Sequence, residues 1–223
     1  MLLTMTAMAQ KPAVKEAEIS IEDIKTVLEA KEIFLHSFDM TEFNDEVYSI
    51  IPFVEEYENG KLNEESLIRV SLGMNKTDVR KFGERADEWR KTYGMKRRQN
   101  VHTLMNKAGI YLYPVSDSTI KVTFNMENIG SFGAPLHKKA YGKGPQADSP
   151  AQYSHRPFKL VPKEHAEIIR LPLVMVGSFW YDERYDVYRF CGENEIDPEL
   201  TSEILKNCPH YFIIGIELHE GDL

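Results

Sequence analysis

Apolar residues recur at helical spacing in several stretches of the first half of the chain. Over residues 21–31 they fall on one face, and Ser20 with Asp23 three residues later forms a capping-box pattern at its start. Residues 77–93 and 97–107 carry similar stripes, which stop at Gly94 and Gly109, so together they predict a helical hairpin. A weaker helical pattern over residues 43–51 stops at Pro52.

The second half of the chain changes to a period of two, which is typical of strands. Strands are predicted over residues 67–72, 110–115, 119–126, 166–176, 178–181, 185–191 and 211–218. Turns are expected at residues 59–60, at 116–118 and at the hairpin tip 181–185. Because short turns join most of these strands, the pattern predicts an α+β fold with a largely antiparallel sheet and helices clustered in the N-terminal half.

The length of 223 residues favours one domain, which we expect to span residues 18–223. The alternative is a subdomain boundary at residues 128–157, a segment of 30 residues with four glycines and four prolines. Connections are usually about 4 to 6 residues long, and loops far above that length are commonly functional or disordered. This loop is therefore interpreted either as a ligand-binding segment or as a solvated linker or mobile flap.

The same loop provides the candidate binding residues. Its basic and aromatic side chains could bind an anion or stack on a planar ligand. The candidates are His137, Lys139, Tyr141, Tyr153, His155 and Arg156.

The net charge is −8, from 27 Lys and Arg against 35 Asp and Glu, which argues against attraction of the whole chain to nucleic acid or anionic lipid. Residues 76–107 reverse this balance, with ten basic and four acidic side chains. A basic helical hairpin could neutralise phosphates, so nucleic-acid binding is one hypothesis for this segment. A solvated helix face is the alternative, and the overall acidity favours it.

The first residues resemble the end of a secretory signal peptide, because Ala7 and Ala9 supply a small-x-small pattern before Gln10. We therefore expect residues 1–17 to be a signal-peptide remnant with a flexible N-terminus, and the protein to be periplasmic or secreted. No basic residue precedes Lys11, and without a signal the protein would be cytoplasmic. No apolar run approaches the roughly 20 residues of a membrane-spanning helix.

The two cysteines leave both a disulfide and free thiols open. Cys191 ends a predicted strand, whereas Cys208 ends a predicted helix that begins at Pro198 after an Asp197 N-cap. If this helix runs back along the strand, it carries Cys208 beyond the roughly 7 Å between Cα atoms that a disulfide tolerates. Export favours a bridge and this geometry favours free thiols.

Known catalytic spacings are absent from the sequence. Gly142-Lys143-Gly144 lacks the P-loop pattern, the Gly-Ser pairs miss the nucleophile elbow, and the seven histidines are scattered without a metal-binding spacing. Paired carboxylates such as Glu55-Glu56 are interpreted as exposed surface. We therefore predict no catalytic residues, no metal and no cofactor.

The function favoured by these observations is that of an exported soluble binding or interaction protein, whose partner would be an envelope protein or a glycan. A hydrolase of unrecognised type acting on a glycan or peptide is one alternative. A cytosolic nucleic-acid-binding protein using residues 76–107 is the other.

Two short motifs carry a resemblance to a known group. Ala7-Met8-Ala9-Gln10 and the stretch Trp180-Tyr181-Asp182-Glu183-Arg184-Tyr185-Asp186 resemble exported Bacteroidetes proteins of an uncharacterised domain family. The resemblance implies a compartment and no activity, so it assigns no functional residues.

Overall fold

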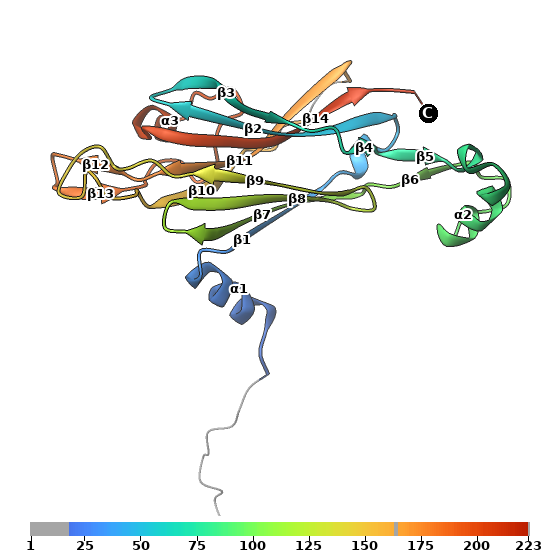
Figure 1. Cartoon of the computed structure of the whole chain (residues 1–223), viewed down its shortest axis with the longest axis horizontal. Helices are drawn as coiled ribbons and strands as arrows, with labels where there is room; N and C mark the ends of the chain where they lie inside the picture. Colours follow the sequence, from blue (N-terminus) through green and yellow to red (C-terminus); the bar gives the residue numbers. More distant parts are fainter. Residues whose placement is uncertain (1–17, 163–164, 223) are drawn as a thin grey trace, which may run out of the picture.

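The computed structural model describes residues 18–162 and 165–222, and the signal-peptide pattern lies outside these residues. Two antiparallel sheets lie face to face as a β-sandwich (Figure 1). The first sheet has the order β1 (Phe34–Asp39), β7 (Lys107–Ser116), β8 (Thr119–Met126), β9 (Gly130–His137). The second has the order β10 (Tyr153–Pro157), β11 (Ile168–Ser178), β14 (His210–Glu220), β2 (Tyr48–Glu58), β3 (Lys61–Arg69), and β4 (Gly73–Met74) also pairs with β2.

The main core lies between the two sheets. Alternate residues of β14, such as Phe212, Ile214 and Ile216, face inward and belong to the same buried cluster as Val122 and Phe124 of β8. The other face of β14 contributes Tyr211 and Ile213 to a second buried cluster, which also contains residues of the segment before β14. Because both faces are covered, β14 reads as a nearly continuous apolar run rather than as a strict alternation.

The segment before β14 folds over the outer face of the second sheet and contains the short helix α3 (Glu203–Asn207). The Glu193 carboxylate accepts hydrogen bonds from the backbone N–H groups of Glu203 and Ile204 at 2.8 and 3.2 Å, which caps this helix. The helix predicted from Pro198 to Cys208 is longer than the observed α3, because Leu200 has a positive φ of 59° that a helix does not allow. Cys191 is an exposed and Cys208 a buried free thiol.

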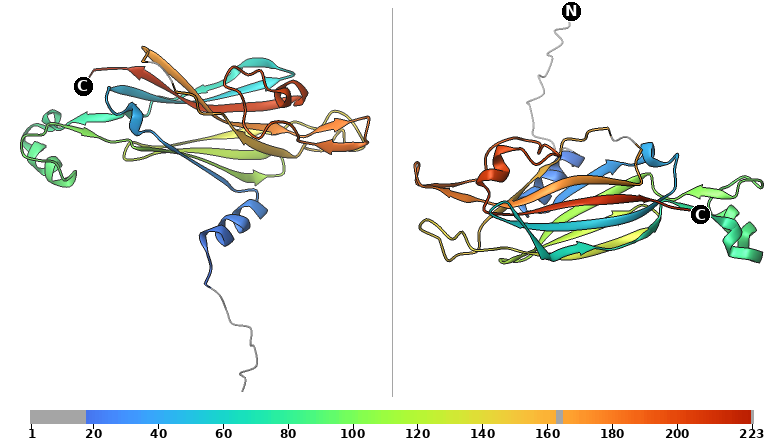
Figure 2. Two further views of the ribbon diagram at one scale, coloured as in Figure 1. Left: turned by 180° about the vertical axis from the view of Figure 1, so that it is seen from behind. Right: turned by 90° about the horizontal axis from the view of Figure 1, so that it is seen from above.

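Two small ribbons extend from the sandwich (Figures 1 and 2). One pairs β12 (Trp180–Asp182) with β13 (Val187–Arg189), as the predicted hairpin tip requires. The other pairs β5 (Lys76–Asp78) with β6 (Val101–Thr103) and carries the 3-10 helix η2 (Val79–Arg85) and α2 (Ala86–Thr92).

The predicted helical hairpin over residues 77–107 is wrong. Gly83, at φ 57°, breaks the helical path within η2, α2 ends at Thr92, and β6 lies within the range of the second predicted helix. The aromatic residues of the predicted apolar stripe still pack together. The Phe82 ring stacks on Trp89 at 4.5 Å between ring centroids, and the Tyr93 ring stacks on His102 at 4.4 Å. Aromatic packing on a short ribbon produced the spacing that resembles a long helix.

The helix predicted over residues 43–51 is also wrong, since the short 3-10 helix η1 (Thr41–Phe43) ends where it should begin and the strand β2 starts at Tyr48. Pro52 lies inside β2. The Pro52 carbonyl oxygen accepts a hydrogen bond from the Val70 N–H at 3.2 Å. The backbone nitrogen of Pro52, which carries no hydrogen, therefore faces the residues just after β3 and not β14. The sheet therefore loses no β2–β14 hydrogen bond.

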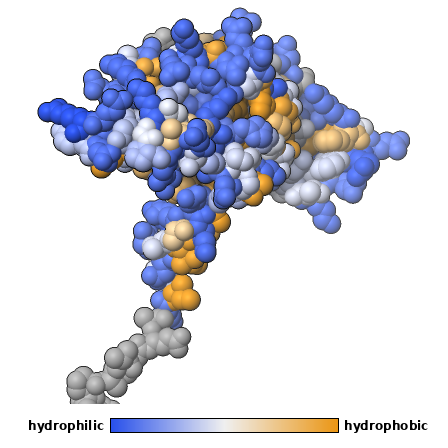
Figure 3. Space-filling view, turned by 60° about the vertical axis from the view of Figure 1, so that its left-hand side comes forward, coloured by the Kyte–Doolittle hydropathy of each residue, from blue (hydrophilic) through white to orange (hydrophobic). Residues whose placement is uncertain are grey.

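Helix α1 (Ile21–Ala30) confirms the first predicted element, and Ser20 with Asp23 forms the expected capping box. None of its side chains is buried, and apolar residues gather along its surface (Figure 3).

The prediction of a largely antiparallel sheet is confirmed. The clustering of helices in the N-terminal half is not confirmed, and no helix of the described residues is long and apolar enough to cross a membrane.

Candidate functional site

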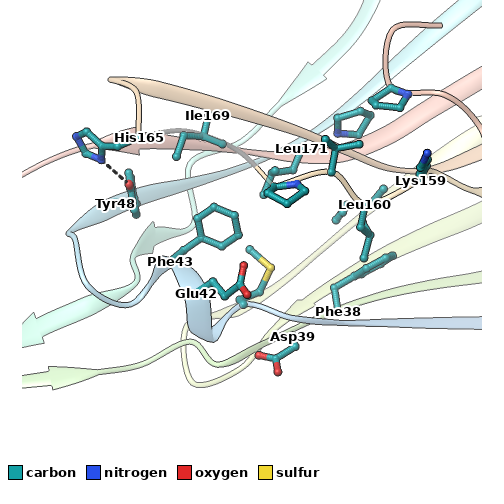
Figure 4. Close-up of a pocket in the computed structure, with 16 residues that line it drawn as sticks. Phe38, Asp39, Glu42, Phe43, Tyr48, Lys159, Leu160, His165, Ile169 and Leu171 are labelled. Carbon is teal, nitrogen blue, oxygen red and sulfur yellow. Dashed lines mark hydrogen bonds between the residues drawn. The ribbon is translucent and has the colours of Figure 1, made fainter. Parts of the chain in front are cut away.

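An apolar cleft opens into the core at one side of the sandwich (Figure 4). Strand β10 pairs only with Val174 to Ser178 of β11, so the first half of β11 has no strand beyond it within the described residues. On the facing sheet, β1 is an edge strand. The two sheets therefore leave a cleft of 380 Å³ between β1, η1, β11 and residues 159–162.

The wall of this cleft is mainly apolar and its rim is polar. Phe38, Phe43, Leu160, Ile169 and Leu171 supply much of the apolar wall. At one end of the rim the Tyr48 hydroxyl lies 3.2 Å from His165 Nδ1, and burial together with the charges of Glu46 and Glu220 raises the pKa of Tyr48. Lys159, Asp39 and Glu42 place both signs of charge around the opening. A mainly apolar wall with a few polar groups is the usual composition of a ligand pocket.

A polar cluster lies at one end of the sandwich, where alternate residues of β2 and β14 point to the inner face. His210 Nε2 lies 2.7 Å from Glu56 Oε1, and the Tyr153 hydroxyl contacts His210 Nδ1. The backbone N–H of Lys139 donates to the same hydroxyl at 3.0 Å. The Lys139 Nζ lies 2.6 Å from Glu58 Oε1 and 3.9 Å from Glu56 Oε1. We call these five residues the Glu56–His210 cluster.

The protonation states in the cluster follow from its hydrogen bonds. The Glu56 carboxylate can only accept, so His210 Nε2 carries the ring hydrogen and Nδ1 accepts from Tyr153. Burial lowers the pKa of His210, although Glu56 acts in the opposite direction, and the ring is neutral. Burial alone would raise the pKa of Glu56, but the hydrogen bonds and nearby positive charge outweigh it and lower that pKa.

This chain of groups has the order of a nucleophile, a base and an orienting carboxylate, yet it lacks an activated nucleophile. The Tyr153 hydroxyl is held by Lys139 and His210, and burial raises its pKa above the usual range. Tyr153 is not part of the wall of the neighbouring 580 Å³ cleft. Burial also raises the pKa of the Cys208 thiol to about 11, and this thiol points at the carbonyl oxygens of Ser178 and His210 at 3.2 Å each. The hydrolase alternative gains no support from these groups.

The structure distributes the six loop candidates over several places. Strands β9 and β10 take up the ends of the predicted loop. Lys139 and Tyr153 meet in the Glu56–His210 cluster, and buried Tyr141 lies nearby with its ring 4.0 Å from that of Tyr188. His137 is exposed at the end of β9, whereas Arg156 donates to backbone carbonyls of residues 155, 190 and 193.

His155 is the last of the six loop candidates. Its Nδ1 lies 3.1 Å from His36 Nε2, where the edges of the two sheets meet.

The interpretation of Glu55 and Glu56 as exposed surface is wrong, because these residues are 5% and 8% exposed. His210 and Glu58 were missed as well. Their proximity depends on the β2–β14 register, which pairs Glu58 with His210 and is not visible in either segment alone.

His155 is expected to make stability depend on pH. Burial lowers its pKa to about 4, and the charges of His36 and Arg156 act in the same direction. The unfolded state has the ordinary value of about 6.5, so between these values it binds more protons than the folded state and stability falls as the pH falls. Allowing for the partial exposure of the ring, the free energy of unfolding should contain about 1 to 2 kcal/mol less from this group at pH 5 than at pH 7.5.

Urea unfolding of the wild type and of His155→Gln at both pH values tests this expectation. The variant should lose most of that contribution to the pH dependence. His137→Gln is the matched control, since His137 is exposed. An unchanged pH dependence in His155→Gln would contradict the expectation.

A second buried charge network lies on the outer face of the second sheet. The Arg170 guanidinium lies 2.5 Å from Glu55 Oε2, and Arg69 lies 3.0 Å from Glu217 and 3.8 Å from Glu55. The Tyr57 hydroxyl donates to Glu55 at 3.0 Å. Each carboxylate of this network has a partner, which is typical of a structural arrangement.

The fold defines a mostly antiparallel β protein with an apolar cleft at its side. The chain belongs to the family described as Domain of unknown function (DUF5041), whose model matches residues 3–220. This confirms the expected membership of an uncharacterised domain family, while the expected Bacteroidetes source is not shown. Comparisons with curated proteins and with solved structures find no match.

Proposed function

We propose that this protein is a non-enzymatic binding protein that holds a small, mainly apolar ligand in the cleft between β1 and β11. The cleft reaches the main core, because buried Met40, Tyr48, Ile169 and Leu173 line it and belong to that core cluster. This opening of the core toward solvent is the observation that carries the proposal.

The size and composition of the cleft support a small ligand. Its volume of 380 Å³ lies near the lower end of the roughly 300 to 1,000 Å³ range of small-molecule pockets. Each buried CH₂ group would contribute about 0.8 kcal/mol, so a short hydrocarbon or an aromatic ring gains most of its affinity from the wall. The polar rim would then orient the ligand through Tyr48, His165 or Lys159.

The proposed partner is therefore a small apolar molecule and not the envelope protein or glycan suggested by the sequence. The N-terminal pattern of residues 1–17 supports an exported protein. An exported binding protein of this kind would present the cleft to ligands outside the cytoplasm.

Binding of the uncharged fluorescent probe N-phenyl-1-naphthylamine tests the proposal, with Leu160→Asp as the main variant. Leu160 lines the cleft and is 66% exposed, so its replacement costs the fold little. We expect saturable binding to the wild type and a dissociation constant about tenfold higher for Leu160→Asp, equivalent to about 1.4 kcal/mol.

Val115→Asp is the matched control, because Val115 is similarly exposed, at 61%, and does not line this cleft. It should bind the probe as the wild type does. The proposal is wrong if the wild type shows no saturable binding, or if the two variants have the same affinity.

A further inference from the structure

The Glu56–His210 cluster gathers three ligand atoms suited to a metal ion. Oxygens of Glu56 and Glu58 and a ring nitrogen of His210 lie within 4.8 Å of one another. Glu56 and Glu58 are two residues apart on β2, so both point to the same face of the sheet. The β2–β14 register places His210 directly opposite Glu58. We propose that these three side chains bind a divalent transition-metal ion such as Zn²⁺.

The charge in the cluster already selects for a cation. Two carboxylates converge here, and the Lys139 ammonium lies between them at 2.6 Å from Glu58 and 3.9 Å from Glu56. The Lys139 side chain is 50% exposed, so it can move into solvent and release both carboxylates. A divalent ion would then take the place of the ammonium and neutralise both negative charges. Lys139 acts in this arrangement as a built-in competitor of the metal.

The residues around His210 hold its ring in one position, as the ring of a metal ligand must be held. Its imidazole is buried and fixed by the Tyr153 hydroxyl on Nδ1. A metal-binding histidine usually donates a hydrogen bond from its second ring nitrogen, so Nδ1, which accepts from Tyr153 here, would become the donor when Nε2 binds the ion. Binding requires the ring hydrogen to be on Nδ1 instead of Nε2, and the Tyr153 hydroxyl would then rotate from donating to Nδ1 to accepting a hydrogen bond from it. Solvent in the neighbouring cleft would take the proton from Nε2 and supply one to Nδ1, so the ring stays neutral, Lys139 keeps its proton and the net number of protons does not change.

The ligand set indicates which ions would be preferred. One imidazole with two carboxylates suits Zn²⁺ and related ions, whereas Mg²⁺ and Ca²⁺ prefer all-oxygen sites. His210, Glu58 and Lys139 also line the 580 Å³ cleft, so the remaining coordination position would face solvent. A water molecule could complete the coordination there. This site is separate from the apolar cleft.

Isothermal titration of the chain with ZnCl₂ tests the proposal through two variants with opposite expected effects. Lys139→Met removes the competing ammonium and should lower the dissociation constant at least tenfold. Glu58→Gln removes one ligand and should raise it at least tenfold. The Glu58 side chain is 47% exposed, so both substitutions lie at accessible positions that the fold tolerates.

Two matched controls separate this site from other zinc-binding histidines. Lys143→Met removes a 72% exposed lysine from the same loop, and Glu65→Gln removes an exposed carboxylate from β3. Both should bind one Zn²⁺ with the wild-type affinity, while MgCl₂ in place of ZnCl₂ should give at least a hundredfold weaker binding. Absence of zinc binding, or equal zinc affinity in Lys139→Met, Glu58→Gln and the controls, would overturn the proposal.

Discussion

Replacing Arg170 with methionine is expected to lower the free energy of unfolding by about 3 kcal/mol. Its guanidinium lies 2.5 Å from Glu55, whose side chain is only 6% exposed, and 4.5 Å from the centre of the Phe53 ring. Without Arg170, the nearest positive charge to Glu55 is Arg69 at 3.8 Å. Removing one member of a buried ion pair costs about 3 to 5 kcal/mol, and the 34% exposure of Arg170 places this variant at the lower end.

Urea unfolding at neutral pH would measure this loss. The double variant Arg170→Met/Glu55→Gln should recover part of the stability, because the unpaired charge is removed together with its partner. Arg184→Met is the matched control, since Arg184 is exposed and its guanidinium lies over the Tyr185 ring. If Arg170→Met changes stability no more than Arg184→Met, the ion pair contributes little and Glu55 is adequately held by Tyr57 and Arg69.

The strands whose apolar pattern reflects burial on one face were predictable from the sequence. Strands β7 and β8 lie on either side of a Ser-Asp-Ser turn, and the prediction of both is confirmed. The failures occurred where another structure produces the same spacing. Phe82, Trp89 and Tyr93 recur as they would on one long helix, but they stack around a break at Gly83. Strand β2 was missed because Pro52 was taken to end a helix, although a proline can lie inside a strand where its missing N–H faces the break between β3 and β4.

The sites were less predictable than the strands because they depend on sheet pairing. Lys139 and Tyr153 were identified from the composition of their loop, but their partners Glu56 and His210 lie on strands far away in sequence. The apolar cleft depends on β10 being shorter than β11, which leaves the side of the sandwich open. Neither strand register nor the relative lengths of edge strands is encoded in a local pattern. Composition could therefore locate part of one candidate site and none of the cleft.

Replacing Gly215 with alanine is expected to destabilise the protein by about 3 kcal/mol, at the upper end of the usual cost of overpacking. A Cβ at this position would lie 2.3 Å from the Leu171 carbonyl oxygen and 2.5 Å from Phe53 Cζ. Gly215 belongs to the central strand β14, where it pairs with Pro172 on one side and Phe53 on the other. The Phe53 ring is fully buried beneath Arg170, so neither the ring nor the backbone can move away easily.

Thermal unfolding is the simplest measurement of this effect, because about 3 kcal/mol should lower the midpoint by roughly 6 to 12 °C for a domain of this size. Gly221→Ala is the matched control: its Cβ would meet the terminal methyl of Met74 at 2.7 Å, which is the flexible end of a side chain. The control should lie within about 0.5 kcal/mol of the wild type. A similarly small change in Gly215→Ala would mean that β14 can shift against both neighbours.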